Sequence, residues 1–247
     1  MNAFEQLAQD IKTKNSVVCV GLDPMQATTA DEIVSFNKHI IDATHDLVVA
    51  FKPQMAFYER FGATGWDAFK QTIDYIHSKG VLAIDDSKRG DIGSTSQAYA
   101  KAHFEELGAD FITVNPYLGS DGVAPFLTYK DKGVFVLCRT SNPSAKELQD
   151  DIYMKVAQLI NQWGSGAVVG ATYPEEAKAL RAAMPNSMWL VPGYGAQGGT
   201  AESVRPCFTA GGSGAIISSS RGIIYDKDPR AAAMKMRDEL NAVRSHV

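Results

Sequence analysis

The chain has 247 residues, of which 45% are hydrophobic and 21% are charged, and it contains no low-complexity tract and no Pro/Ser-rich linker between two halves. This length suits one large α/β barrel or two ordinary domains, and the uniform composition favours a single domain over residues 1–247. The formal net charge is -4 and the Lys and Arg residues are scattered, which argues against a nucleic-acid or anionic-membrane surface and favours a small-molecule ligand.

The N-terminal segment, residues 2–14, has helical periodicity and lacks the apolar core of a signal peptide. No stretch reaches the roughly 18 to 20 continuous apolar residues of a membrane span, so the sequence predicts a cytoplasmic protein. Cys19, Cys138 and Cys207 are odd in number and widely spaced, and we expect all three to be reduced. No Cys or His cluster indicates a metal, and we expect the histidines to have surface or packing roles.

Short runs rich in β-branched residues recur about every 30 residues and alternate with amphipathic patterns. Near-continuous hydrophobic strands separated by amphipathic helices indicate a parallel sheet covered by helices. Eight such units predict a (β/α)8 TIM barrel, with residues 2–14 as a helix that caps its bottom. The alternative is an open doubly wound sheet, which usually carries a GxGxxG turn after its first strand, where this chain has GLDPMQ. The predicted strands are 17–23, 47–54, 81–88, 111–117, 134–140, 166–172, 188–193 and 214–222, and the predicted helices are 31–45, 64–79, 94–108, 121–131, 146–163, 174–184, 201–210 and 229–245.

Polar and charged side chains stand at the carboxyl ends of the predicted strands. In (β/α)8 barrels these ends form the face that carries the active site. The pattern therefore predicts that side chains far apart in the sequence converge on one site. The strand-end residues are Asp23, Lys52, Gln54, Asp86, Lys88, Asp91, Asn115, Thr140, Ser141 and Arg221.

The end of the third strand lies in the stretch IDDSKRGDIGST, residues 84–95. Asp86 and Lys88 are two residues apart, so both side chains point toward the barrel interior, whereas Asp85 points toward the helices and is assigned no role. Gly90 lets the backbone turn, so that Asp91 can reach sideways. Because partly desolvated carboxylates and ammonium groups seldom increase stability, this cluster predicts a functional site.

Two alternatives explain the same stretch without catalysis. One is a solvated ion-pair cluster in which Ser94 or Thr95 caps the following helix. The other is the tripeptide Arg89-Gly90-Asp91 as an adhesion ligand, which requires an exposed loop tip on a secreted protein.

The stretches VPGYGAQGG (191–199) and SSSRGIIY (218–225) follow the last two predicted strands. Barrels commonly bind phosphate with these two loops, through backbone N–H groups that glycine leaves accessible. Gln197 can donate a hydrogen bond there, and Arg221 can bind phosphate oxygens with two parallel hydrogen bonds. The sequence therefore predicts a phosphate site at this edge of the barrel.

The motifs GLDP, FKPQ, DxKRGDIGST, TSNPS, PGYGAQGG and SSRGI occur in this order over nearly the whole chain. In this combination the chain resembles the orotidine 5′-phosphate decarboxylases, in particular the branch with KRGDIG after the lysine. The resemblance implies a cofactor-free and metal-free conversion of orotidine 5′-monophosphate to uridine 5′-monophosphate and CO2, the final step of de novo pyrimidine synthesis. One departure is the serine run 218–220, where many family members have glycine.

The resemblance also implies roles for individual residues. Lys52, Asp86, Lys88 and Asp91 match an alternating Lys-Asp-Lys-Asp array whose last aspartate comes from the partner subunit, so a homodimer with shared active sites is expected. The substrate-binding positions implied or listed as possible contacts are Asp23 and Lys52 for the ribose, Asp91 and Thr95 for the same sugar across the interface, Ser141 with Thr140 and Asn142 for the pyrimidine, Gln197 and Arg221 for the phosphate, and Gln54 and Asn115 without an assigned group.

Two further functions stay open on the sequence. A metal-dependent sugar-phosphate decarboxylase or aldolase could use the same scaffold, because DxKxxD also occurs in such relatives. A noncatalytic protein that binds phosphate ligands, or one that acts through the Arg-Gly-Asp tripeptide, would bind without releasing CO2.

Overall fold

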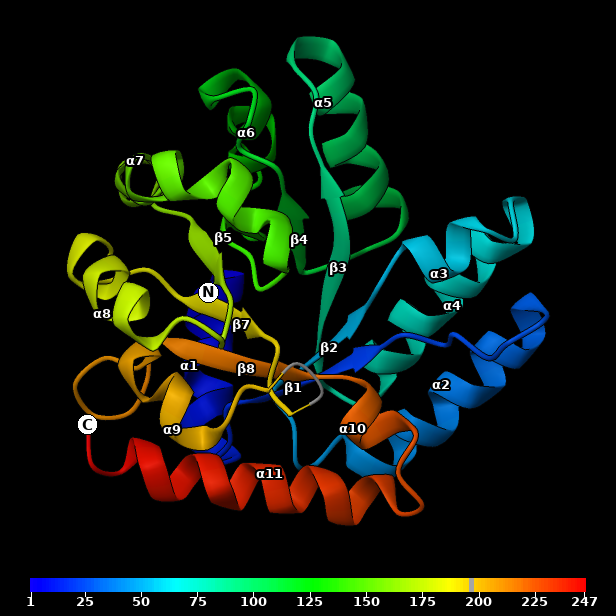
Figure 1. The fold of residues 1–247 in the computed structure, drawn as a ribbon. Coiled ribbons are helices and arrows are strands. Elements are labelled where there is room, and N and C mark those ends of the chain that lie inside the picture. The colour runs from blue at the N-terminus through cyan, green and yellow to red at the C-terminus, as the bar shows by residue number, and fades with distance from the viewer. Residues whose placement is uncertain (196–197) are drawn as a thin grey trace.

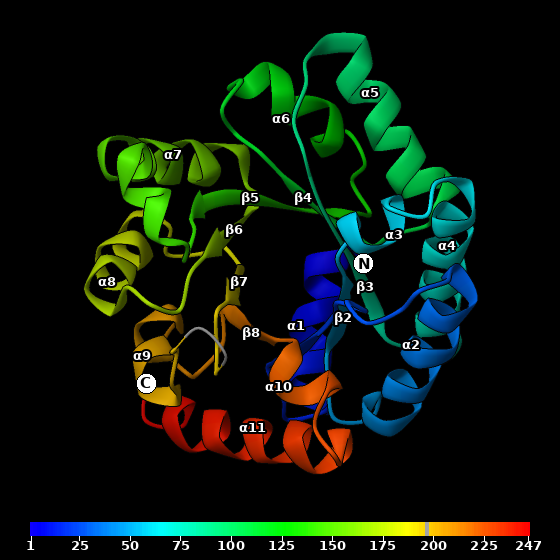
Figure 2. The same cartoon turned by 45° about the vertical axis from the view of Figure 1, so that its right-hand side comes forward.

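The predicted strands form because their side chains are covered on both faces, by the barrel interior on one side and by helices on the other. In the described residues of the computed structural model, 1–195 and 198–247, eight parallel strands close into a barrel in sequence order, and β8 pairs with β1. Figures 1 and 2 show the strands at the centre with the helices around them. The predicted (β/α)8 barrel is confirmed. The strands are β1 (Val18–Leu22), β2 (Ala50–Pro53), β3 (Leu82–Arg89), β4 (Phe111–Val114), β5 (Gly133–Arg139), β6 (Gly166–Val169), β7 (Trp189–Pro192) and β8 (Ala215–Ser219).

The helices pack an apolar face against the barrel, as their periodicity predicts. Between β8 and the final helix, and after β2, the structure adds short helices that were not predicted. The helices are α1 (Ala3–Thr13), α2 (Ala30–Thr44), α3 (Ala56–Glu59), α4 (Ala63–Ser78), α5 (Gly93–Lys101) followed by the π-helix η1 (Ala102–Glu106), α6 (Ser120–Leu127), the 3-10 helix η2 (Pro143–Glu147), α7 (Gln149–Trp163), α8 (Pro174–Ala183), α9 (Ala201–Val204), the 3-10 helix η3 (Arg205–Cys207), α10 (Arg221–Ile224) and α11 (Pro229–Arg244).

One local prediction is wrong, and one of the alternatives to a functional site is not supported. The segment 201–210 is not one helix, because Pro206 lacks the N–H that an α-helical turn needs, and the chain changes there from α9 to the 3-10 helix η3. Neither Ser94 nor Thr95 caps α5: the residue at the N-cap is Ile92, and no side chain makes a capping hydrogen bond. The charged stretch before α5 is therefore not explained as a helix cap.

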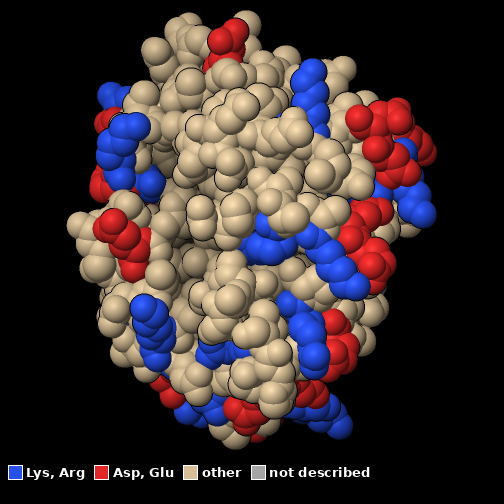
Figure 3. Space-filling view, turned by 90° about the vertical axis from the view of Figure 1, so that its left-hand side faces the viewer, with Lys and Arg blue, Asp and Glu red and all other residues tan. Residues whose placement is uncertain are grey.

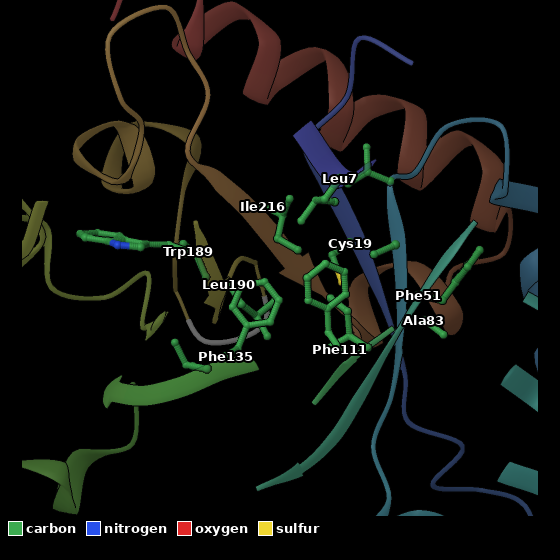
Figure 4. Packing of buried hydrophobic residues seen from close by; sticks show 14 of the residues in the cluster. Leu7, Cys19, Phe51, Ala83, Phe111, Phe135, Trp189, Leu190 and Ile216 are labelled. Atoms are coloured by element: carbon green, nitrogen blue, oxygen red, sulfur yellow. The ribbon is translucent and has the colours of Figure 1, made fainter. Parts of the chain in front are cut away.

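The bottom of the barrel is closed by aromatic side chains and by α1, which confirms the predicted capping helix. The ring of Phe4 in α1 lies edge-on to those of Phe111 and Phe135, with centroid distances of 5.1 and 5.5 Å. Figure 4 shows Phe111 and Phe135 side by side within the barrel. Gly133 leaves room for this layer, since a Cβ there would lie 2.2 Å from Cδ1 of Phe111. The opposite, carboxyl end of the strands is the end that carries a cavity.

On the face shown in Figure 3, basic and acidic side chains are interspersed, and no continuous basic stripe crosses it. None of the helices in residues 1–195 and 198–247 combines the length and the apolar character needed to cross a membrane. The three cysteines are free, as predicted, and all three are buried.

Candidate active site

A cavity with a volume of about 620 Å³ opens at the carboxyl ends of the strands. This size is typical of sites for small molecules and nucleotides. The cavity lies where barrels of this type carry their active sites. Residues from most of the strand ends line it: Asp23, Lys52, Gln54, Asp86, Lys88, Leu137, Thr140, Ser141, Asn142, Pro143, Val168, Leu190, Pro192, Gly193, Tyr194, Ser218, Ser219, Ser220 and Arg221.

Asp86 is the centre of a charged cluster in this cavity, and its side chain is only 8% exposed. Lys52 Nζ donates to Oδ2 at 2.6 Å, and Lys88 Nζ donates to Oδ1 at 2.5 Å. Gln54 Nε2 donates to Oδ2 and Thr113 Oγ1 to Oδ1, each at 3.1 Å. Because the donors approach both oxygens, the carboxylate is held in one orientation with both ammonium groups fixed beside it.

The charges in this cluster stabilise one another. Burial acts to raise the pKa of Asp86, but the charges of Lys52 and Lys88 outweigh it and hold the pKa well below its ordinary value. Burial acts to lower the pKa of Lys52, but the charges of Asp86 and Asp23 outweigh it and raise the pKa above its ordinary value. Beneath the cluster, burial raises the pKa of Cys19 to about 12, so this thiol stays neutral.

Lys88 has an unusual backbone conformation at the end of β3. Its φ is 49°, in the left-handed region that few residues other than glycine adopt. Such a conformation costs about 1 to 3 kcal/mol and persists only where the surroundings hold it. The Lys88 N–H donates to Thr113 Oγ1 at 2.9 Å, and the pairing of β3 with β4 shifts register between Asp85 and Arg89. The strand is therefore kinked at the residue whose ammonium enters the cavity.

Thr113 is a residue of the site that the sequence did not predict. It is buried on β4, accepts from the Lys88 backbone and donates to the Asp86 carboxylate. One feature of the sequence could have indicated it: Thr113 lies two positions after Phe111 on the same strand, so both side chains point into the barrel interior. Thr113 thus connects the two charged residues of β3 from the neighbouring strand.

Asp23 and Ser220 bring polar atoms to the cavity from the ends of the adjacent strands β1 and β8. Asp23 Oδ1 and Ser220 Oγ are buried, and neither has a hydrogen-bond partner among the described residues. Buried polar atoms normally have partners, and both residues line the cavity, so they are candidates to bind polar groups of a ligand.

The loop after β5 supplies Thr140, Ser141 and Asn142, all of which line the cavity. Thr140 is held in place: its N–H donates to Gln149 Oε1 at 2.8 Å, and its hydroxyl donates to Asn142 Oδ1 at 2.6 Å. Gln149, at the start of α7, also donates to the Thr140 hydroxyl at 2.7 Å. Two hydrogen bonds between Thr140 and Gln149 therefore hold the loop to the start of α7.

Arg221 begins α10, and its exposed side chain stands at the edge of the cavity next to Ser220. Gly193 and Tyr194 line the cavity from the loop after β7, and the Tyr194 hydroxyl donates to Glu239 Oε2 of α11 at 2.6 Å. The structure thus brings together the two loops in which the sequence predicts a phosphate site. Gln197 lies outside the described residues.

Three of the predicted site residues do not line the cavity of this chain. Asp91 is half-buried beside the following loop, and its Oδ1 accepts from the Ile92 N–H at 2.8 Å. Thr95 is exposed on the first turns of α5, and Asn115 is exposed with its Oδ1 accepting from the Tyr117 N–H at 3.0 Å. All three lie beyond the ends of β3 and β4, on one side of the cavity.

The adhesion alternative is not supported. The guanidinium of Arg89 is engaged within the molecule, by Glu59 and by His103. Within the part of the chain that the structure describes, no group of three or more His, Cys, Asp or Glu residues could hold a metal ion.

The comparisons with known proteins agree with this geometry. A family model described as the orotidine 5′-phosphate decarboxylase / HUMPS family matches residues 16–236. The chain is 46% identical over 242 residues to an orotidine 5′-phosphate decarboxylase of Herpetosiphon aurantiacus, covering 90% of this chain and 89% of that protein. It is 46% identical over 245 residues to the protein of that name in Haloarcula marismortui, covering 91% and 87%. A solved structure, the OMP decarboxylase of Leishmania donovani, superimposes with a TM-score of 0.93 at 42% identity and covers 99% of both chains.

The family model matches most of the chain, and the two relatives are 46% identical to it. The Lys-Asp-Lys cluster at the strand ends of the barrel agrees with this match. The chain therefore belongs to the orotidine 5′-phosphate decarboxylase / HUMPS family.

Proposed function

We propose that this chain decarboxylates orotidine 5′-monophosphate to uridine 5′-monophosphate and CO2, the final step of de novo pyrimidine nucleotide synthesis. The observation that carries the proposal is the Lys88 ammonium, fixed on the buried Asp86 carboxylate and 42% exposed toward the cavity. The names of the similar proteins support the same reaction.

Loss of CO2 breaks the bond between ring carbon C6 and the carboxylate, and the electron pair stays on C6. No neighbouring carbonyl of the ring can accept that pair, so the protein has to stabilise a carbanion-like centre. The Lys88 ammonium gains interaction energy as negative charge moves onto C6, and it then donates its proton to C6. Solvent reprotonates the amine after product formation.

Asp86 has two effects in this proposal. It keeps Lys88 oriented, and with Lys52 it completes a cluster whose charges are set before the substrate binds. Its carboxylate also lies close to the substrate carboxylate, and the repulsion is relieved when CO2 leaves. We assign the larger share of the rate enhancement to the electrostatic stabilisation of C6.

The substrate is oriented from three sides of the cavity. Asp23, whose buried Oδ1 has no partner in residues 1–195 and 198–247, would accept from a ribose hydroxyl, with Lys52 beside it. Ser141, flanked by Thr140 and Asn142, would contact the pyrimidine edge. Arg221 would bind the phosphate, and Gln197 is its proposed partner in the loop after β7.

The active form is proposed to be a homodimer in which Asp91 and Thr95 complete the site of the partner subunit. The support is that both residues lie outside the cavity of their own chain, next to exposed apolar side chains. Ile92 is 51%, Tyr117 73% and Leu118 47% exposed. Exposed apolar side chains grouped on one side of a protein are typical of an interface.

The test follows the ultraviolet absorbance of orotidylate in the presence of chelator-treated protein. We expect loss of orotidylate with formation of uridylate and CO2 in equal amounts, unchanged by the chelator. Abolition of activity by the chelator would favour a metal-dependent decarboxylase or aldolase. Binding of orotidylate without CO2 release would favour a noncatalytic binding protein.

A further inference from the structure

A second group of polar side chains lies behind β3, on the face that points away from the cavity. Asp85 and His103 are both fully buried, and Asp85 Oδ2 lies 2.5 Å from His103 Nδ1. Arg89 Nε lies 3.0 Å from His103 Nε2. The Arg89 guanidinium also contacts the Glu59 carboxylate of α3. These four residues, the outer relay, run from the interior of the helix layer to its surface.

The contacts of His103 assign the protons on its ring. The Nε of a guanidinium can only donate, so His103 Nε2 accepts and carries no proton. Nδ1 therefore carries the ring proton and donates it to Asp85. The imidazole is neutral, with its proton on Nδ1. Its two hydrogen bonds connect the Asp85 carboxylate to the Arg89 guanidinium and fix their relative orientation.

The surroundings of the outer relay restrict its motion. The Arg89 guanidinium lies 5.2 Å from the ring centroid of Tyr99 in α5, which is within the range of a cation–π interaction. The Trp66 ring of α4 lies 5.9 Å from that of His103. His103 itself belongs to the π-helix η1, and such turns occur frequently at functional sites.

The outer relay holds β3 on both sides of its kink. Asp85 and Arg89 are the two residues between which the pairing of β3 with β4 shifts register. Lys88, with its left-handed backbone, lies directly before Arg89. The side chains of Asp85 and Arg89 both make their contacts in the helix layer, so the two ends of the kinked segment are held from the same side.

We propose that Asp85, His103, Arg89 and Glu59 are positioning residues that fix Lys88 in its left-handed conformation and thereby keep its ammonium on Asp86. This inference rests on the proposed function, since it assigns to the outer relay an effect on the chemical step. It predicts that the outer relay governs kcat, while the groups that bind ribose and phosphate set the affinity for nucleotide.

The test uses His103→Asn and His103→Gln in the full chain, with kcat and KM for orotidylate and the Kd of uridylate as readouts. In His103→Asn the amide can still donate to Asp85, but Arg89 loses its acceptor. In His103→Gln the amide oxygen reaches toward Arg89 in place of Nε2. We expect kcat to fall about 10- to 100-fold in His103→Asn, with KM and the uridylate Kd within about twofold of wild type, and a partial recovery of kcat in His103→Gln.

Thr72→Val is the matched control, because it removes a buried hydrogen bond from the same helix layer. Thr72 Oγ1 accepts from Asn37 Nδ2 at 3.1 Å, and Thr72 is 1% exposed. This variant should lower Tm and leave kcat unchanged. If the His103 variants lower Tm as Thr72→Val does and keep the wild-type kcat, the outer relay is only structural and the inference is wrong.

If the His103 variants do not fold, Glu59→Gln tests the positioning role instead. The Glu59 side chain is 38% exposed, so removing its charge leaves the core intact. We expect a two- to fivefold lower kcat with unchanged KM; an unchanged kcat overturns the inference.

Nitrogen NMR of the wild type adds a readout that does not depend on activity. Nε2 of His103 should have the chemical shift of an unprotonated imidazole nitrogen, and a protonated Nε2 also contradicts the assignment. A wild-type protein that releases no CO2 would refute the proposed function, whereas an active wild type with unaffected variants would refute only the positioning role.

Discussion

The ammonium nitrogen of Lys88 lies 2.5 Å from Oδ1 of Asp86, although the Lys88 backbone has a left-handed φ of 49°. The contact therefore does not follow from regular strand geometry, in which residues two apart simply share a face. It depends on the kink in β3 and on the groups that hold that kink. This relationship underlies the predictions for activity.

Lys88→Ala should reduce kcat to less than about a hundredth of the wild-type value, because it removes both the charge that stabilises C6 and the proton that C6 receives. Steady-state kinetics with orotidylate measure the effect. Lys70→Ala is the control: it removes an exposed ammonium that pairs with Asp74, and it should leave kcat unchanged. A Lys88→Ala protein that retains more than about a hundredth of the wild-type rate would contradict the assigned role.

Thr113→Val should lower both stability and turnover. The isosteric change leaves the Lys88 N–H without its acceptor and removes one donor from Asp86. We expect a loss of about 1 to 3 kcal/mol in the free energy of unfolding, measured by denaturant titration. We also expect kcat to fall about tenfold, because the ammonium is less well held. Thr113→Ser keeps the hydroxyl and should stay close to wild type in kcat; equal losses in both variants would argue against the hydrogen bonds.

Arg221→Ala should decrease kcat/KM for orotidylate by about 100-fold or more, because a charge-assisted contact with the phosphate is lost. The same variant should have nearly the wild-type kcat/KM for orotidine, which lacks the phosphate. The ratio of the two effects isolates the phosphate contact from general damage to the site. An equal loss with both substrates would show that Arg221 acts on something other than the phosphate.

A mixture of Lys88→Ala and Asp91→Ala chains should regain activity that neither variant has alone. If Asp91 completes the partner's site, a mixed dimer contains one site with both residues intact and one site with neither. After unfolding and refolding of an equal mixture, about a quarter of the sites should therefore be intact, because half of the dimers are mixed. Absence of any recovery, with dimers present by ultracentrifugation, would rule out shared sites.

The acid stability of the protein should depend on Asp86. Its pKa is lower in the folded protein than in the unfolded chain, where a value near 3.9 is expected. The unfolded chain therefore binds the proton first as the pH falls. The stabilisation is fully present above about pH 5 and is lost as the pH drops below about 4. Between pH 5 and pH 3, Tm should fall more steeply in the wild type than in Asp86→Asn; equal slopes would contradict the coupling of Asp86 to its two lysines.

Much of the fold could be predicted from the sequence because the pattern that defines it is local. Each buried strand reads as a short apolar run, and each helix as an amphipathic repeat, so the barrel and its capping helix follow from their order. Helix boundaries were less predictable. In the segment 201–210, for instance, Pro206 overrides a pattern that otherwise predicts one helix.

The sequence by itself determined that charged residues stand at the strand ends, and strand parity predicted that Asp86 and Lys88 share a face. The structure brings the two side chains together, but through a kinked strand that parity does not describe. Only the tertiary structure decided the role of Thr113 and of the outer relay, in which Asp85 and His103 form a buried pair. The physical reason is that hydrogen bonds and ion pairs join residues that meet only when the barrel closes. Neither the composition nor the period of a strand specifies which side chain on a neighbouring element lies within 3 Å of it.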